Sequence, residues 1–208
     1  MRPKTLTVSS LDDDANGIAE DQTTAGADNL TLDGALVSSG TATMAEAQKI
    51  SIESTGALNG VTFTVTGTDA DGRSITEDIT GPNNETVTGS KFFKTVTNIA
   101  VDGAVGTNVE VGVLKAQGGV TKTLPSNWRQ SSGSYAVIIA DTATVSVQHT
   151  LDDVQDHSSE PNWLTNEGIS SITASDDGNH AFPIRGTRLL LASWTSGDVS
   201  MTYIQPDN

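Results

Sequence analysis

Apolar residues alternate with threonine and serine through much of the chain, a period of two that is typical of half-buried β-strands. The clearest case is residues 61–66, reading VTFTVT, in which the valines and the phenylalanine face one side and the threonines the other. A short Asp/Gly turn follows at residues 69–72, and residues 73–80 then carry two isoleucines in phase. Two alternating runs joined by such a turn predict a β-hairpin.

The same alternation predicts strands in both halves of the chain, at residues 6–8, 30–37, 49–53, 92–101, 108–113, 135–140, 144–150, 187–193 and 199–204. No helical periodicity longer than two turns is visible. A single short helical turn is expected at residues 161–166, inside the long polar stretch 152–179. The sequence therefore predicts an all-β fold.

Composition and breaks suggest how these strands are divided. Residues 1–40 are rich in Asp, Asn and Gly turns and short of apolar residues, so we expect an extended N-terminal arm that lies on another domain or another subunit. Two adjacent glycines, Gly118 and Gly119, interrupt any strand and mark a boundary. The prediction is two small β-sandwich domains, residues 41–118 and 119–208, preceded by the arm.

The charge balance narrows the classes of partner. The 208 residues hold 11 Lys and Arg against 26 Asp and Glu, which gives a formal net charge of −15. Phosphate contacts need a concentrated basic surface, so neither a nucleic acid nor an anionic membrane is an expected partner. No apolar run approaches the roughly 20 residues of a membrane span. Cysteine is absent, which excludes disulfides, thiolate metal sites and a cysteine nucleophile.

No signature of catalysis stands out. The sequence contains no G-x-S-x-G elbow, no P-loop and no dinucleotide fingerprint. Carboxylates suitable for acid–base work are so abundant that their presence identifies no site. We therefore expect a protein that is not an enzyme and that carries no cofactor.

One acidic segment has the composition of a calcium loop. Asp12, Asp14 and Asn16, followed by a glycine, match the opening of an EF-hand loop, in which alternating oxygen ligands surround the ion. The closing glutamate of such a loop is missing, because Thr23 stands at its position. The competing interpretation is an ordinary Asp/Asn/Gly turn in a polar segment. Histidine offers no ligand pairs, and His149 is expected to be partly buried on a strand face.

Aromatic and basic residues of the second half are candidates for binding. Trp163 lies in the polar stretch and could anchor a glycan or a protein, or it could fill the domain's core as the other tryptophans, Trp128 and Trp194, could. Arg185 and Arg188 are conspicuous in so acidic a chain. They are expected either to pair with acids of the same chain or to dock on an acidic partner.

A resemblance to known proteins adds to this picture. Residues 48–113 contain VTFTVTGTDADG, then ITGPNN, then KFFKTVTNI and a valine-rich end. This stretch resembles a recurring Ig-like β-sandwich module of tailed-bacteriophage virion proteins, and residues 25–40 (AGADNLTLDGALVSSG) resemble the arm before it. Residues 144–204, with TVSVQHTLDD, IRGTRLLLASW and VSMTYIQ, resemble more loosely a second sandwich of phage head and fibre proteins.

The resemblance implies a structural protein of the virion, assembled in the host cytoplasm, and most specifically a head decoration or cement protein. Its partner would be the major capsid protein or another virion protein, and the chain itself would form a homo-oligomer, with a trimer suggested by the local threefold positions of an icosahedral shell. Two alternatives stay open. One is a head fibre, tail fibre or tail component, and the other is a glycan-binding module that uses Trp163.

Overall fold

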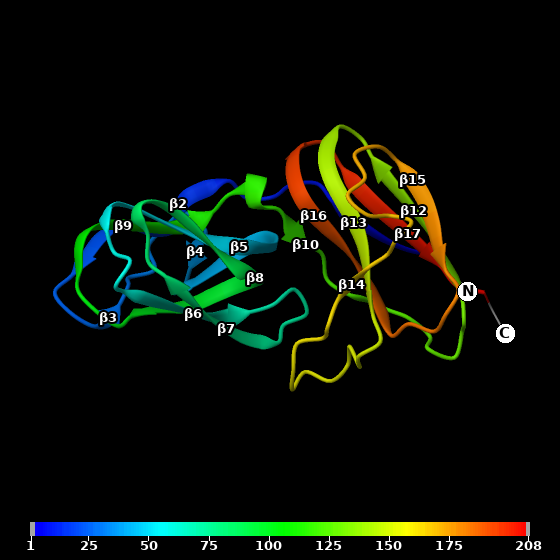
Figure 1. Cartoon of the computed structure of the whole chain (residues 1–208), viewed down its shortest axis with the longest axis horizontal. Coiled ribbons are helices and arrows are strands. Elements are labelled where there is room, and N and C mark those ends of the chain that lie inside the picture. Colours follow the sequence, from blue (N-terminus) through cyan, green and yellow to red (C-terminus); the bar gives the residue numbers. More distant parts are fainter. Residues whose placement is uncertain (1–2, 207–208) are drawn as a thin grey trace. The chain divides into compact units, whose positions relative to one another are not determined.

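The computed structural model describes residues 3–206, and within them the chain consists of β-strands joined by loops and one short 3-10 helix. This confirms the all-β prediction. The chain divides into two compact units (Figure 1), one formed by residues 11–117 and the other by residues 118–206 together with residues 3–10. No helix among the described residues is long and apolar enough to cross a membrane.

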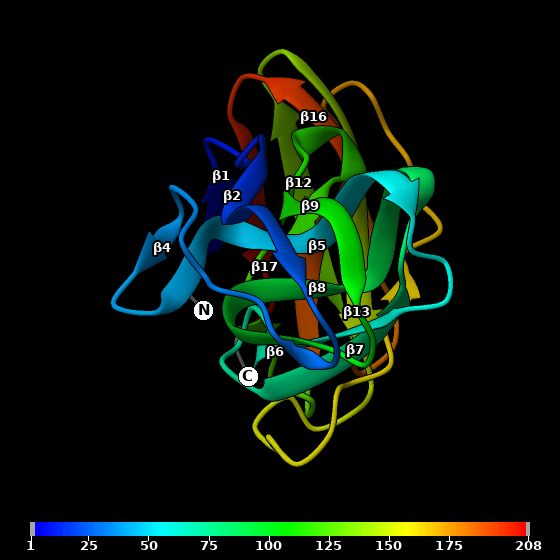
Figure 2. The same cartoon turned by 90° about the vertical axis from the view of Figure 1, so that its left-hand side faces the viewer.

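The first unit, residues 11–117, is built on two long strands, β5 and β8, that pair antiparallel. β5 also pairs with β9, and β8 also pairs with β6, so β5 lies between β8 and β9 (Figure 2). β6 pairs onward with β7, and β9 with β2. The elements of this unit are β2 (Asp14–Thr24), β3 (Asp28–Asn29), β4 (Val37–Ser38), β5 (Thr41–Ala57), β6 (Thr62–Thr68), β7 (Ser74–Thr80), β8 (Asn83–Val101), β9 (Val105–Val113) and η1 (Lys115–Gln117).

Alternate residues of these strands form the core of the first unit. Phe63, Phe93, Ile50 and Ile99 are fully buried in it, together with a row of valines from β6, β8 and β9. β7 shows the strict alternation of exposed and buried positions that a strand with one solvated face requires. Burial of this apolar face, and not local propensity, is what holds so threonine-rich a chain in strands.

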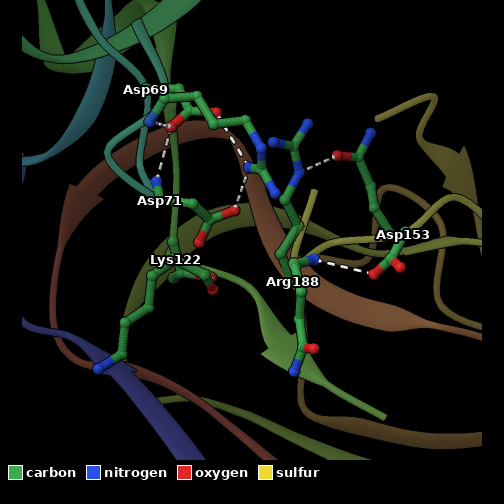
Figure 3. Close-up of polar contacts among 9 residues, drawn as sticks. Asp69, Asp71, Lys122, Asp153 and Arg188 are labelled. Atoms are coloured by element: carbon green, nitrogen blue, oxygen red, sulfur yellow. Dashed lines mark hydrogen bonds and ion pairs between the residues drawn. The ribbon is translucent and has the colours of Figure 1, made fainter. Parts of the chain in front are cut away.

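The hairpin predicted for residues 61–80 is confirmed. β6 and β7 pair in register from Thr62 opposite Thr80 to Thr68 opposite Ser74. The turn between them is fixed by Arg73, which is 2% exposed and donates from Nη1 to Asp69 at 3.2 Å and to Asp71 at 2.9 Å (Figure 3). Two carboxylates around one guanidinium hold the tip rigid, because a buried charge is stable only when it is paired.

Residues 3–40 belong to both units and are largely paired, which differs from the extended arm expected for residues 1–40. β1 (Lys4–Val8) is in register with β17 (Val199–Ile204) of the second unit, Leu6 opposite Met201. β2 instead joins the first unit through β9. This segment forms strands although it has few apolar residues. Strands far away in the sequence provide partners for its backbone hydrogen bonds and bury its apolar side chains.

The strand predicted for residues 30–37 is wrong. The chain has only the two-residue strands β3 and β4 on either side of this segment. Leu30 is nevertheless buried, and its backbone N–H donates to the carbonyl of Ile99 at 2.8 Å. The alternation there reflects isolated contacts of a loop with the core, which resemble a strand pattern over a short stretch.

The second unit contains two antiparallel sheets. One has the order β1–β17–β12–β15, and in the other β16 pairs with β13, β10 and β11, while β14 lies beside β13. The inward faces carry Tyr135, Tyr203, Leu189 and Ile169, all fully buried. The remaining elements are β10 (Gly119–Val120), β11 (Leu124–Pro125), β12 (Gly133–Ile139), β13 (Thr142–Thr150), β14 (Leu164–Thr165), β15 (Asp176–His180) and β16 (Gly186–Ser196).

The polar stretch 152–179 contains no helix, so the helical turn expected at residues 161–166 is wrong. The short strand β14 occupies that segment, where Leu164 is opposite His149 of β13. The loop is held by Ile169, which is fully buried, and by Ile172, which exchanges backbone hydrogen bonds with Val145. Pairing with the edge of β13 satisfies the backbone better than an isolated turn of helix would.

Candidate functional site

Arg185 lies at an open pocket of about 570 Å³ in the second unit, lined also by Trp128, Arg129, Leu151, Pro183 and Ile184. The backbone at this point is a bend directly before β16. Arg185 donates its N–H to the carbonyl of Thr150 at 2.8 Å, and its own carbonyl accepts from Ser126 at 2.9 Å. These bonds fix the base of the Arg185 side chain while its head remains partly exposed.

The side chains around this pocket are of the types that dominate protein interfaces. Trp128 is 52% exposed and Leu151 is 58% exposed. The guanidinium of Arg129 lies 5.3 Å from the centre of the Trp128 ring, a cation–π contact. We call Trp128, Arg129, Leu151 and Arg185 the Trp128 surface.

Arg185 forms an ion pair with Asp153 in the loop after β13. The hydrogen bond from Arg185, followed by one from the backbone of Gln155, holds the pKa of Asp153 below its usual range. This is the intramolecular pairing expected as one of two possibilities from the sequence. It leaves the guanidinium about one-third exposed, at the edge of the pocket.

The other two predicted partner-binding residues, Arg188 and Trp163, are paired with each other. The Arg188 guanidinium lies 4.1 Å from the centre of the Trp163 ring. Its Nε donates to Oε1 of Gln148 at 2.8 Å (Figure 3), across the β13–β16 register. One face of the indole is thus occupied by an arginine of the same chain, which differs from the open aromatic platform that a glycan site on Trp163 would need.

A larger pocket of about 820 Å³ lies elsewhere in the second unit, where β14, β15 and the loop after each of them meet the end of β13. Its lining includes His149, His180, Leu164, Phe182 and the carboxylate residue Glu167. Phe182 and Leu164 are 44% and 55% exposed, so apolar surface is open to solvent here. We call this the Phe182 pocket.

His180 in this pocket is a structural residue. Its Nδ1 lies 2.7 Å from the carbonyl oxygen of Phe182 and its Nε2 lies 3.0 Å from the hydroxyl of Tyr203. Burial lowers the pKa of the His180 imidazole, and the hydrogen bond to Phe182 opposes that shift in part. Both ring nitrogens are engaged, so His180 fixes the backbone of Phe182 and has no free atom for a ligand.

His149 is in a different situation. It is 6% exposed, as the sequence predicted for a residue on that strand face, and its ring meets the ring of Phe182 edge-on at 5.3 Å. Its Nδ1 is buried without a hydrogen-bond partner among residues 3–206. Burial, and secondarily His180, lowers the pKa of His149, so the imidazole is neutral near pH 7.

The residues considered as calcium ligands lie in the first unit. A carboxylate oxygen of Asp12 accepts from the N–H of Ala45 at 2.6 Å, and Asp14 accepts from the N–H of Asn16 at 3.4 Å. In the part of the chain that the structure describes, no three His, Cys, Asp or Glu residues gather closely enough to hold a metal ion. The carboxylate of Asp12 thus accepts from the backbone of a distant segment, and that of Asp14 accepts from the backbone two residues on.

Sequence patterns did not reveal the two pockets. Phe182 is not among the binding residues predicted from the sequence. Its place beside a proline in a polar loop, outside any alternating strand, could have indicated an exposed aromatic side chain. The sequence does not decide whether Trp128 lies in the core or on the surface, and the structure shows that it is exposed. Both residues come near their neighbours only through strand pairings between distant segments.

Comparisons with known proteins add little. No family model matches the sequence, and no curated protein matches it. Among solved structures, an allantoicase from Saccharomyces cerevisiae aligns with 78% of this chain and 76% of that chain, at 10% identity and a TM-score of 0.24. A likeness at that level carries no argument about this chain.

Proposed function

We propose that this chain is a non-enzymatic structural protein of a tailed-bacteriophage virion, and specifically a decoration protein bound to the capsid. The observation that carries the proposal is the resemblance of residues 48–113 to a module of phage virion proteins. That stretch spans most of β5 and all of β6 to β9, which belong to one compact all-β unit. The resemblance therefore covers the larger part of one folding unit, residues 11–117, but not its strands β2 to β4.

The partner is the major capsid protein, and we place the contact at the Trp128 surface. Tryptophan and arginine are the residues that most often dominate binding energy at interfaces. None of the residues lining that pocket is acidic, although the chain has a net charge of −15. The Trp128 surface fits a segment of the capsid protein that carries an apolar side chain and a carboxylate. That carboxylate would compete with Asp153 for Arg185.

The mechanism follows from many weak contacts acting together. A homo-oligomer, of which a trimer suits the local threefold positions of a shell, would engage neighbouring capsid subunits and oppose their separation. Linked contacts raise the overall affinity well above that of one contact. The strong negative charge keeps such a protein soluble before assembly and away from the genome.

The first experiment is localisation. Antibody raised against the recombinant chain is used for immunogold labelling of particles sedimented from a lysate of the source. Gold over the whole shell is the expected result. Label confined to one vertex or along a tail would overturn the decoration role in favour of a fibre or tail component, and antigen found only in the supernatant would overturn the virion role.

The second experiment tests the surface. Trp128→Ala and Arg185→Ala are expected to abolish co-sedimentation with capsids that lack the protein. Ile138→Ala, which removes another exposed apolar side chain of the same unit, and Lys122→Ala, which removes another exposed positive charge, serve as matched controls and should bind normally. Equal binding by all four variants would show that the Trp128 surface is not the contact.

A further inference from the structure

The Phe182 pocket is independent of the proposed capsid contact. Its volume of about 820 Å³ falls within the range of small-molecule sites. It combines exposed apolar walls with hydrogen-bonding groups, which is the usual composition of such sites.

The apolar wall is held in place and left uncovered. Phe182 is 44% exposed, yet its carbonyl is held by His180 at 2.7 Å and its ring meets the His149 ring. Leu164, 55% exposed, also lines the pocket. A partly exposed aromatic ring held by neighbouring rings can receive a flat apolar surface at little cost in side-chain entropy.

A polar group of the pocket lacks a partner. Nδ1 of His149 is buried without a hydrogen bond among the described residues, although a buried polar atom of this kind is costly to leave unpaired. Because this atom is shielded from solvent, the imidazole serves to pack against the Phe182 ring and is not itself a contact for a ligand.

The charges around the pocket select the kind of ligand. Glu167 and Asp177 are the charged side chains of its lining, both exposed, and no lysine or arginine is among the lining residues. Carboxylates accept hydrogen bonds from hydroxyl groups and repel anions. An anionic ligand such as a phosphate or a sialic acid is thus disfavoured, whereas a neutral polyhydroxyl compound is not.

We propose that the Phe182 pocket binds a neutral saccharide, with the apolar face of one pyranose ring on Phe182 and hydroxyl groups hydrogen-bonded to Glu167 and Asp177. This is a different site from the one that the sequence offered for glycans. Trp163, already stacked with Arg188, takes no part in it. The proposal does not depend on the virion role, because it rests on the pocket alone.

The test is a titration of the folded chain with neutral methyl glycosides of glucose, galactose and N-acetylglucosamine, followed by amide and imidazole NMR shifts. At least one glycoside should give saturable shifts at residues 164–168 and 177–182 and at the His149 ring. Phe182→Ala should weaken binding by about tenfold or more, equivalent to about 1.4 kcal/mol. Glu167→Gln should weaken it by a smaller factor.

Matched controls keep the test decisive. Ile138 is 54% exposed in the same unit and is not part of the pocket lining, so Ile138→Ala should bind like the unaltered chain. Both substituted apolar residues are exposed, and each variant's amide spectrum is compared first to establish folding. Absence of saturable shifts with every glycoside would overturn the proposal. The proposal would also be overturned if Phe182→Ala and Glu167→Gln bound a glycoside as tightly as the unaltered chain does. Tighter binding of acetate or methylammonium than of any glycoside would overturn it as well.

Discussion

The rings of Tyr135 and Tyr203 stack 5.1 Å apart at an interplanar angle of 20°, but their hydroxyl groups differ in what they contact. The Tyr203 hydroxyl meets Nε2 of His180 at 3.0 Å and Oγ of Ser126 at 3.1 Å. The Tyr135 hydroxyl is buried without a hydrogen-bond partner among residues 3–206. Burial raises the pKa of both groups, to about 12 for Tyr203, so both are neutral and differ in bonding alone.

This pair gives a matched test of hydrogen bonding in the second unit. Tyr203→Phe should lower the free energy of unfolding by about 1–2 kcal/mol, because it removes the hydrogen-bond partner of Nε2 of His180 and of Oγ of Ser126. Tyr135→Phe should leave it unchanged or raise it slightly. Urea unfolding followed by tryptophan fluorescence reports on this unit, since all three tryptophans lie in it. Equal destabilisation by the two changes would contradict the conclusion that only the Tyr203 hydroxyl is hydrogen-bonded.

The second unit should also lose stability as the pH falls. Burial lowers the pKa of His149 and His180 in the folded state, so the unfolded chain binds their protons more tightly. The free energy of unfolding is therefore unaffected by these two histidines above their ordinary pKa of about 6.5. It falls as the pH drops from there through the lowered pKa values of the folded state.

The measurement is urea unfolding by tryptophan fluorescence at a series of pH values between about 5 and 8, a range set by the ordinary histidine pKa. All three histidines lie in the second unit, so this dependence should be missing from the first. His149→Phe should flatten the curve. An unchanged slope in that variant would show that His149 is not one of the groups responsible.

Arg73 should be a main source of stability at the tip of the β6–β7 hairpin. Arg73→Ala removes a guanidinium that is 2% exposed and with it the positive charge that Asp69 and Asp71 share. We expect a loss of about 2–3 kcal/mol in the first unit, measured by urea unfolding with far-UV circular dichroism. Arg73→Lys keeps the charge but not the forked geometry and should recover only part of it. Full recovery would mean that charge alone is needed.

Gly67 marks a close approach between β6 and β8. A Cβ at this position would lie 1.9 Å from the carbonyl oxygen of Thr95, at the register shift between Thr66 and Gly67. Backbone cannot yield as a side chain can, so Gly67→Ala should destabilise the first unit by about 1–3 kcal/mol.

The control for that change is Gly60→Ala, where nothing lies within 4 Å of the added atom. It should change stability by no more than about 1 kcal/mol in either direction. Amide hydrogen exchange in β6 and β8 compares the two variants locally. Faster exchange in the Gly60 variant than in the Gly67 variant would refute the close-approach argument.

The sequence by itself determined what depends on neighbouring residues. Alternation of valine, phenylalanine and threonine at residues 61–66, with an Asp/Gly turn after it, was enough to predict the β6–β7 hairpin. The burial of His149 followed from its phase with the valines before it on the strand. Such features are local, because a side chain's face in a strand is set by its parity.

The tertiary structure alone decided what depends on residues far apart in the chain. The sequence predicted a strand at residues 6–8, but that this strand, β1, pairs with β17 almost 200 residues later is decided by the tertiary structure. The pairing of Trp163 with Arg188, and the meeting of Phe182 with His149, likewise arise from strands whose order no local pattern encodes. Periodicity states which side of a strand is buried, whereas the choice of neighbour is made by the free energy of the whole sheet.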